Sequence, residues 1–175
     1  PLASNLKAKY GLEFLSIGGG IGIIYEDALA SGSAKWWNQP KTKKFLTPEK
    51  YASTLIPLLE PLELKILLEP GRFISGNAGI LVTRVEYVKR TGQKYFAIVD
   101  AAMNDLLRPA FYESYHEIVP VLQSRNRPIA TDVVGGICET GDTFCKNRLI
   151  PRMEEGDLIA MLSAGAYGFV MAGTY

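Results

Sequence analysis

The sequence predicts an α/β segment followed by a mostly β domain. Residues 14–17 form an apolar run that ends in three glycines, residues 47–56 have helical features, and residues 64–68 form a second apolar run that ends in Glu-Pro-Gly-Arg. Strand, glycine loop, helix and strand in this order are typical of a parallel sheet. After about residue 79 short β-rich runs follow one another. We therefore expect a domain boundary at 78, between domains 1–78 and 79–175.

The helix of the first domain has recognisable ends. Thr47 is a suitable N-cap, and Pro48 suits the first helical position, where its missing N–H costs nothing. Pro57 is expected to stop the helix, because proline lacks the hydrogen-bond donor that a helix interior needs. The helix is therefore expected to end near Ile56.

The second domain is expected to contain at least five short strands. Residues 80–88 and 95–99 read as an antiparallel pair, with Gly92 in the turn between them. The other three runs are residues 118–122, 129–134 and 158–162. The uncharged stretch 158–175 is interrupted by glycines and hydroxyl residues, which favours buried strands over a membrane helix.

Composition excludes several functional classes. The chain has 175 residues, with 19 Lys and Arg against 18 Asp and Glu, and this balance argues against a nucleic-acid-binding protein. Two cysteines and one histidine, His116, are too few for a disulfide framework or the usual zinc ligand sets. No motif supports a serine-histidine-aspartate triad. The chain is also about 75 residues shorter than a complete eight-stranded α/β barrel.

Two loops at strand ends are candidates for anion binding. The three glycines Gly18–Gly20 let the backbone approach a ligand and direct N–H groups at a phosphate. Glu69, Pro70, Gly71 and Arg72 follow the next strand, so that both loops could hold one phosphate. A structural turn at the glycines and a local ion pair between Glu69 and Arg72 are the alternatives.

Three further segments carry reactive or binding side chains. Arg108 and Tyr112 lie in an expected loop, where the guanidinium suits a carboxylate; an exposed arginine beside a core tyrosine is the alternative. Cys138, followed by Glu139, could donate a proton or be a small core residue. Tyr167 could stack on a ligand, although core packing is the usual role of an aromatic side chain.

Taken together, these segments resemble the fold-type III, pyridoxal-phosphate-dependent amino-acid decarboxylases. The resemblance covers essentially the whole chain. The matching segments keep the family's order: Ile-Gly-Gly-Gly at 17–20, Glu-Pro-Gly-Arg at 69–72, Val-Asp-Ala-Ala-Met-Asn-Asp at 99–105, Arg-Pro-Ala-Phe-Tyr at 108–112, Cys-Glu-Thr-Gly-Asp at 138–142 and Gly-Ala-Tyr at 165–167. Within the family, segments 108–112 and 138–142 resemble those of the diaminopimelate decarboxylases.

The resemblance implies a binding site for pyridoxal 5'-phosphate. The glycine loop and the Gly71-Arg72 turn would hold its phosphate. Glu69 would face the pyridine nitrogen and keep the ring protonated, which makes it a better electron sink. The cofactor-binding residues that it implies are Gly18, Gly19, Gly20, Glu69, Pro70, Gly71, Arg72 and Tyr167.

The resemblance also implies a reaction, the decarboxylation of meso-2,6-diaminopimelate to L-lysine. Cys138 would protonate the carbon left when carbon dioxide departs, and would reach in from the partner subunit of a cytoplasmic homodimer. The substrate-binding residues that it implies are Arg72, Arg108, Tyr112, Glu139 and Tyr167. The alternatives are a decarboxylase of ornithine, arginine or carboxynorspermidine, or a non-catalytic homologue that acts as a binding partner.

The family's Schiff-base lysine, on an early barrel strand, has no counterpart before Gly18. We therefore expect a C-terminal fragment of a decarboxylase, inactive alone. It would hold the last strands of a (β/α)8 TIM-like barrel, followed by a β-sandwich or β-barrel domain.

Overall fold

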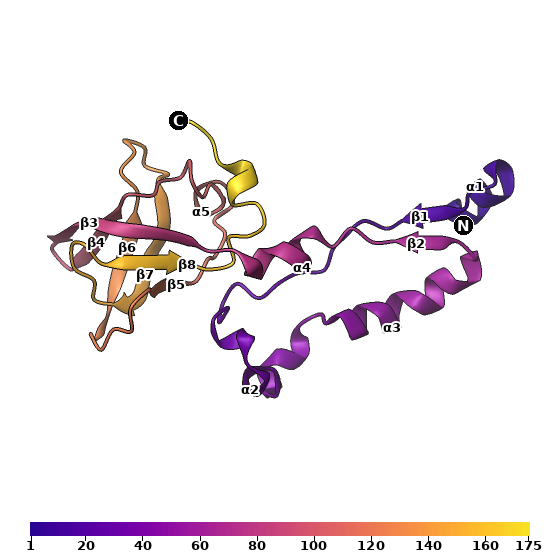
Figure 1. Cartoon of the computed structure of the whole chain (residues 1–175), viewed down its shortest axis with the longest axis horizontal. Coiled ribbons are helices and arrows are strands. Elements are labelled where there is room, and N and C mark those ends of the chain that lie inside the picture. Colours follow the sequence, from indigo (N-terminus) through magenta and orange to yellow (C-terminus); the bar gives the residue numbers. More distant parts are fainter.

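The computed structural model describes all residues from Pro1 to Tyr175. Figure 1 shows an elongated N-terminal part, which carries two short strands and most of the helices, beside a C-terminal β part. The helices are α1 Leu2–Tyr10, α2 Ala34–Trp37, α3 Pro48–Leu59, α4 Gly71–Ser75 and α5 Arg108–Tyr112. The strands are β1 Phe14–Ser16, β2 Lys65–Leu67, β3 Leu81–Thr91, β4 Lys94–Val99, β5 Ile118–Pro120, β6 Pro128–Val134, β7 Thr143–Pro151 and β8 Leu158–Met161. Short 3-10 turns are η1 Ala30–Gly32, η2 Pro40–Lys44, η3 Glu60–Leu62, η4 Gly76–Ala78 and η5 Phe169–Met171.

The N-terminal part contains the predicted parallel strand pair. β1 and β2 run parallel, with Leu15 opposite Ile66, and α3 lies in the connection between them (Figure 1). The Thr47 side chain accepts a hydrogen bond from the Lys50 N–H, at 3.4 Å, so the predicted N-cap is confirmed. This βαβ arrangement brings the loops that follow β1 and β2 to the same edge.

The predicted end of α3 at Ile56 is wrong. The helix continues through Pro57 to Leu59, and the Glu60 N–H donates to the Ile56 carbonyl. Pro57 removes one donor only, and the bonds that follow it preserve the helical path. The extra turn extends the apolar face of α3 toward β2.

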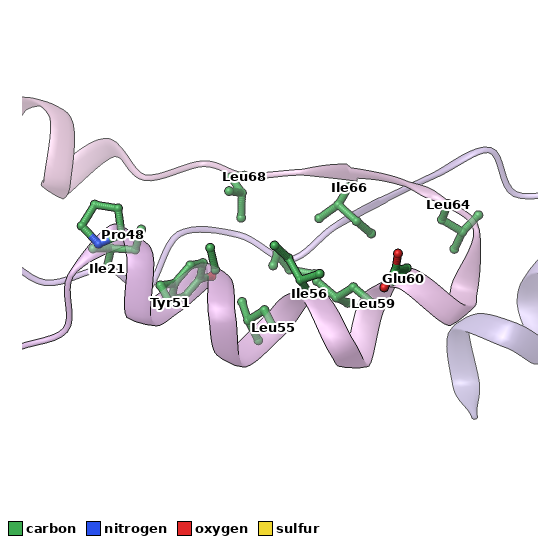
Figure 2. Close-up of a pocket in the computed structure, with 12 residues that line it drawn as sticks. Ile21, Pro48, Tyr51, Leu55, Ile56, Leu59, Glu60, Leu64, Ile66 and Leu68 are labelled. Carbon is green, nitrogen blue, oxygen red and sulfur yellow. The ribbon is translucent and has the colours of Figure 1, made fainter.

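An apolar groove remains open between α3 and the two strands. Figure 2 shows side chains from α3 and from the β2 region pointing toward one another across it. The groove has a volume of about 550 Å³, and ten of its twelve lining residues are hydrophobic. They are Ile17, Ile21, Pro48, Tyr51, Ala52, Leu55, Ile56, Leu59, Glu60, Leu64, Ile66 and Leu68. The apolar face of the βαβ unit is thus incompletely covered within this chain.

The C-terminal part is one mixed, six-stranded sheet that closes nearly into a barrel. The strand order is β5-β8-β3-β4-β6-β7, and the edge strands β5 and β7 approach each other. Only the pair β4–β6 is parallel. The buried side chains form one core around Val85, Val133, Ile159 and Met161, all fully buried. Of the two forms expected for this domain, the barrel is therefore observed and the sandwich is not.

Two expectations for the C-terminal part need correction. Residues 108–112 form the one-turn helix α5 rather than a loop, because Pro109 is tolerated in a first turn. Of the stretch 158–175 only β8 is a strand, and Phe169 and Val170 are 92% and 79% exposed. No helix in the chain has both the length and the apolar character needed to cross a membrane.

Candidate active site

The glycine loop and the Glu69 loop lie against each other at the ends of β1 and β2. The Glu69 N–H donates to the Gly18 carbonyl at 2.8 Å, which continues the pairing beyond the strands. A Cβ on Gly19 would stand 2.6 Å from the Glu69 carbonyl oxygen, too close for any other residue. The close approach of the two loops therefore depends on Gly19.

The glycine loop presents free backbone donors. The N–H groups of Gly19, Gly20 and Gly22 donate to no group of the protein. Gly20 has a φ of +87°, a conformation that L side chains rarely adopt. Tyr51 of α3 donates its hydroxyl to the Gly19 carbonyl at 3.1 Å. The hydrogen bond from Tyr51 thus fixes the loop through a carbonyl, and several of its N–H groups remain available to an anion.

The Glu69 carboxylate is oriented by a neighbouring hydroxyl. Ser16 at the end of β1 donates its hydroxyl to Glu69 Oε1, and the Ser16 oxygen accepts from the Gly18 N–H at 3.2 Å. The carboxylate is exposed and forms no ion pair with Arg72. This observation excludes the local ion pair considered from the sequence.

These loops border a cavity of about 370 Å³. Its volume falls within the range of small-molecule sites. The lining residues are Gly19, Gly20, Ile21, Gly22, Glu69, Pro70, Gly71, Arg72 and Tyr167. The cavity thus combines backbone donors, a carboxylate, a guanidinium and an aromatic ring.

A second cavity of about 330 Å³ adjoins the first. Its lining residues are Arg72, Arg108, Tyr112, Ser114, Tyr167 and Met171. Arg72 and Tyr167 border both cavities, and the Arg72 Cζ lies 5.1 Å from the centre of the Tyr167 ring. The Arg108 Cζ lies 6.0 Å from the same centre. Two guanidinium groups therefore converge on one ring where the cavities meet.

Tyr167 reaches this position because its loop packs tightly on the N-terminal part. The Gly165 N–H donates to the Gly76 carbonyl at 3.0 Å, and the Ala164 N–H donates to the Gly79 carbonyl at 2.8 Å. Tyr167 itself has a φ of +59° and is 43% exposed. Its ring is therefore a cavity wall rather than a core side chain.

Arg108 is the most deeply buried charged group of the site. Its side chain is 7% exposed, and its Nη1 donates to the Tyr25 hydroxyl at 2.8 Å. The same nitrogen lies 3.2 Å from Nε2 of His116. No carboxylate forms an ion pair with Arg108. A buried cation without a counter-ion favours the binding of an anion.

Cys138 and Glu139 lie apart from the two cavities. Both are exposed and belong to the loop between β6 and β7, and neither lines either cavity. The buried Asp142 fixes this loop by accepting from the Ile137 and Met103 N–H groups at 2.8 and 2.7 Å. Within one chain, the structure brings together all the predicted site residues except these two.

Comparisons with known proteins agree with this arrangement. A sequence model for the family described as pyridoxal-dependent decarboxylase, C-terminal sheet domain, matches residues 14–165. The chain belongs to this family. The match includes both loops that line the first cavity, as well as Arg108, Cys138 and Asp142.

Individual members of the family align along nearly the whole chain. Diaminopimelate decarboxylase of Aquifex aeolicus is 45% identical over 99% of this chain and 38% of its own length. Diaminopimelate decarboxylase of Vibrio cholerae is 42% identical over the same shares. The crystal structure of diaminopimelate decarboxylase from Helicobacter pylori complexed with L-lysine has a TM-score of 0.82 at 40% identity, covering 99% of this chain and 40% of that one. The chain spans less than half the length of these relatives.

Tyr25 and His116, which support the Arg108 side chain in this candidate site, were not among the residues predicted from the sequence. Both contact the Arg108 guanidinium, yet Tyr25 lies 83 residues away along the chain. His116 carried one signal, since it is the single histidine of the chain and follows the Arg108 segment closely. Neither residue forms part of a spacing pattern that indicates a contact.

Proposed function

We propose that this chain is the C-terminal part of a diaminopimelate decarboxylase, which uses pyridoxal 5'-phosphate to convert meso-2,6-diaminopimelate to L-lysine and carbon dioxide. The observation that carries the proposal is the convergence of Arg72 and Arg108 on Tyr167, beside the glycine-lined cavity. The identity of 42–45% to diaminopimelate decarboxylases over nearly the whole chain supports it.

The first cavity suits pyridoxal 5'-phosphate in size and in chemistry. The free N–H groups of Gly19, Gly20 and Gly22 and the Arg72 guanidinium are donors for its phosphate. Glu69, held by Ser16, would accept from the protonated pyridine nitrogen. When bound, the cofactor supplies an electron sink for the bond to the departing carboxylate. Gly18, Pro70 and Gly71 would shape the two turns, and Tyr167 would contact the cofactor.

The second cavity suits the amino-acid end of the substrate that keeps its carboxylate. Arg108 is buried, and neither Arg108 nor Arg72 forms an ion pair within the chain. With the Tyr112 hydroxyl, these groups would bind the distal carboxylate through charge-assisted hydrogen bonds. Ornithine has no distal carboxylate, so it would leave both guanidinium groups without an anion.

Cys138 and Glu139 would complete the site of a second copy of the chain. Both are exposed and lie outside their own chain's cavities. We infer a cytoplasmic homodimer in which Glu139 binds the distal ammonium and the Cys138 thiol donates the proton that replaces the lost carboxylate.

Mixing two impaired variants of the complete enzyme, assayed at a substrate concentration well below KM, tests this shared site. Cys138→Ala and Arg108→Met subunits would form mixed dimers with one intact site, so the activity of the mixture should exceed that of either variant alone. A mixture no more active than the two variants measured separately, although mixed dimers form, would contradict the shared site. Co-purification of two differently tagged subunits verifies that the mixed dimers form.

Residues 1–78 would be the last strands of a (β/α)8 barrel, and residues 79–175 the β domain that follows. The parallel pair β1–β2 with α3 in the connection and the open apolar groove (Figure 2) support this division. In a complete barrel, further strands would cover that groove. The lysine that binds the cofactor would lie on one of those strands.

Assays of the complete enzyme decide between the candidate reactions. We expect turnover of meso-diaminopimelate, and little or none of ornithine, arginine or carboxynorspermidine. Preference for one of the last three would contradict the proposal. A purified enzyme without the visible absorption of bound pyridoxal phosphate would favour the alternative of a non-catalytic binding partner.

Replacement of Arg108 tests the substrate site more sharply. Arg108→Gln should raise KM for diaminopimelate by at least about tenfold, because a charge-assisted hydrogen bond contributes roughly 1.5–3 kcal/mol. Arg125→Gln is the matched control, since Arg125 is exposed and lines neither cavity. Equal KM values for the two variants would contradict the proposed role of Arg108 in substrate binding.

A further inference from the structure

His116 is a buried histidine whose two ring nitrogens both have partners. It precedes β5 and is 1% exposed. Nδ1 lies 2.9 Å from the Leu162 carbonyl oxygen, and Nε2 lies 3.2 Å from the Arg108 Nη1. The Tyr25 ring meets the imidazole edge-on, with the ring centres 5.4 Å apart. The imidazole is thus held from three sides.

The chemistry of these partners fixes the protonation of the imidazole. A carbonyl oxygen only accepts, so Nδ1 carries the hydrogen that is donated to Leu162. A guanidinium only donates, so Nε2 accepts from Arg108 with its lone pair. His116 is therefore neutral, in the Nδ1–H form.

The surroundings of His116 favour this neutral form. Burial lowers the pKa of His116 below its usual value, and the guanidinium groups of Arg108 and Arg148 lower it further, against the opposing hydrogen bond to Leu162. The groups that face His116 are Arg108 from α5, the Tyr25 ring, and Arg148 from β7, which donates to the His116 carbonyl. No carboxylate forms a hydrogen bond with the imidazole.

The contact with His116 determines which part of the Arg108 guanidinium remains free. Nη1 carries two hydrogens, and its two partners are Tyr25 and His116. Nη2 and Nε of Arg108 have no partner in the protein. This remaining edge has the paired donors that a carboxylate accepts in bidentate fashion.

We propose that His116 is a positioning residue, which holds the Arg108 guanidinium so that its Nη2–Nε edge meets the distal carboxylate of the ligand. The inference rests on the proposed substrate site. A protonated His116 could not accept from Arg108 and would repel it, so protonation weakens carboxylate binding. The unprotonated state of His116 is the one that binds.

A matched pair of substitutions separates this role from simple packing. His116→Asn places an amide nitrogen near the Nδ1 position, which keeps a donor for Leu162 and removes the acceptor for Arg108. His116→Gln reaches the Nε2 position with an oxygen, which keeps the acceptor for Arg108. A packing role would make the two variants equally defective.

The ligands L-lysine and cadaverine form a second matched pair. They share the same carbon chain and a terminal amine, but only L-lysine has the carboxylate that Arg108 would bind. Calorimetry with the complete decarboxylase holoenzyme gives both dissociation constants without turnover. For His116→Asn we expect a Kd for L-lysine raised about tenfold, and a Kd for cadaverine changed by less than about twofold. His116→Gln should retain most of the affinity for L-lysine.

The pH dependence provides a test that needs no His116→Asn protein. Because burial holds the pKa of His116 below its usual value, protonation of His116 is expected only on the acid side of about pH 6.5, where both ligands still keep their charges. The ratio of the L-lysine Kd to the cadaverine Kd should rise toward acid pH in the parent enzyme and stay flat in His116→Gln. A ratio that rises equally in both proteins, or an equal loss of L-lysine affinity in His116→Asn and His116→Gln, would overturn the inference.

Failure of the proposed function would look different. If Arg108→Gln leaves the Kd for L-lysine unchanged, the substrate site itself is wrong. If Arg108→Gln weakens L-lysine binding while His116→Asn does not, the proposed substrate site is supported and the positioning role of His116 is contradicted. The two results are therefore distinguishable in one set of titrations.

Discussion

Gly165 lies so close to Ser75 that a Cβ on Gly165 would stand 1.9 Å from the Ser75 carbonyl oxygen. This Cβ atom would also stand 2.8 Å from the Gly79 backbone nitrogen. Both contacts are with backbone, which cannot rotate away. Gly165→Ala should therefore push the Tyr167 loop off α4 and lower the free energy of unfolding by about 2 kcal/mol.

Thermal unfolding measures this effect, and Gly173→Ala is the control. Gly173 has open space around its Cβ position and no left-handed φ, so its replacement should change stability by less than about 0.5 kcal/mol. Equal melting temperatures for the two variants would contradict the close packing of the Tyr167 loop. In the complete enzyme, Gly165→Ala should also weaken ligand binding, because Tyr167 borders both cavities.

Asp142 joins the Cys138 loop to the loop that precedes α5. Its carboxylate is 3% exposed and accepts from the N–H groups of Ile137 and Met103. Asp142→Ala would leave two donors without a partner, so we expect it to lower the free energy of unfolding by about 3 kcal/mol. Urea denaturation measures the loss, and hydrogen exchange at the two amides should accelerate.

The control for Asp142 is Glu155→Ala. Glu155 is exposed and forms no hydrogen bond or ion pair through its side chain, and its replacement should change stability by less than about 0.5 kcal/mol. Unchanged amide exchange at Ile137 and Met103 in Asp142→Ala would show that other contacts hold the loop.

Strong local patterns were enough to predict the parallel strand pair and most of the barrel strands. Apolar runs bounded by glycine or proline indicated β1, β2, β6 and β8. β7 was missed because Lys146, Asn147 and Arg148 interrupt its alternation. Its path is fixed instead by pairing with β6 and by Asp132, whose carboxylate accepts the Asn147 N–H at 2.6 Å.

The candidate site shows the same division between local and distant information. Glu69 and Arg72 could be selected from the sequence because charged side chains after strand-end turns are characteristic of binding sites. Arg108 could be selected because a guanidinium group suits a carboxylate ligand. The convergence of Arg72 and Arg108 on Tyr167 depends on the packing of Gly165 on Gly79, a contact between distant segments. No periodicity within either segment encodes that contact.

Asp100 should make the stability of the chain sensitive to acid. The Thr83 hydroxyl and the Arg84 N–H donate to its carboxylate, and these bonds lower the pKa of Asp100 in the folded state. A lowered folded-state pKa stabilises the fold above the unfolded-state pKa, and this contribution disappears as pH falls through the folded value. Asp100→Asn should therefore be less stable than the parent chain at neutral pH. This difference in the free energy of unfolding should disappear below about pH 4.

Denaturation at a series of pH values tests this dependence. Glu155→Gln provides a matched loss of one exposed carboxylate, and its difference from the parent should stay small throughout. If the difference in the free energy of unfolding between Asp100→Asn and the parent stays constant from neutral to acid pH, the charge of Asp100 contributes nothing to stability.

Cys138 and Cys145 should differ sharply in their effect on the complete enzyme. Cys138 is exposed on the β6–β7 loop, whereas Cys145 is buried in the barrel core, where burial raises the pKa of its thiol. If the Cys138 thiol donates the proton in the reaction, Cys138→Ala should lower kcat by about a hundredfold or more, with KM nearly unchanged. Cys145→Ala should lower the melting temperature and leave kcat close to the parent value, because its thiol lies in the core. Steady-state kinetics on both variants separates the two roles, and a Cys138→Ala enzyme with the parent kcat would reduce Cys138 to a surface residue.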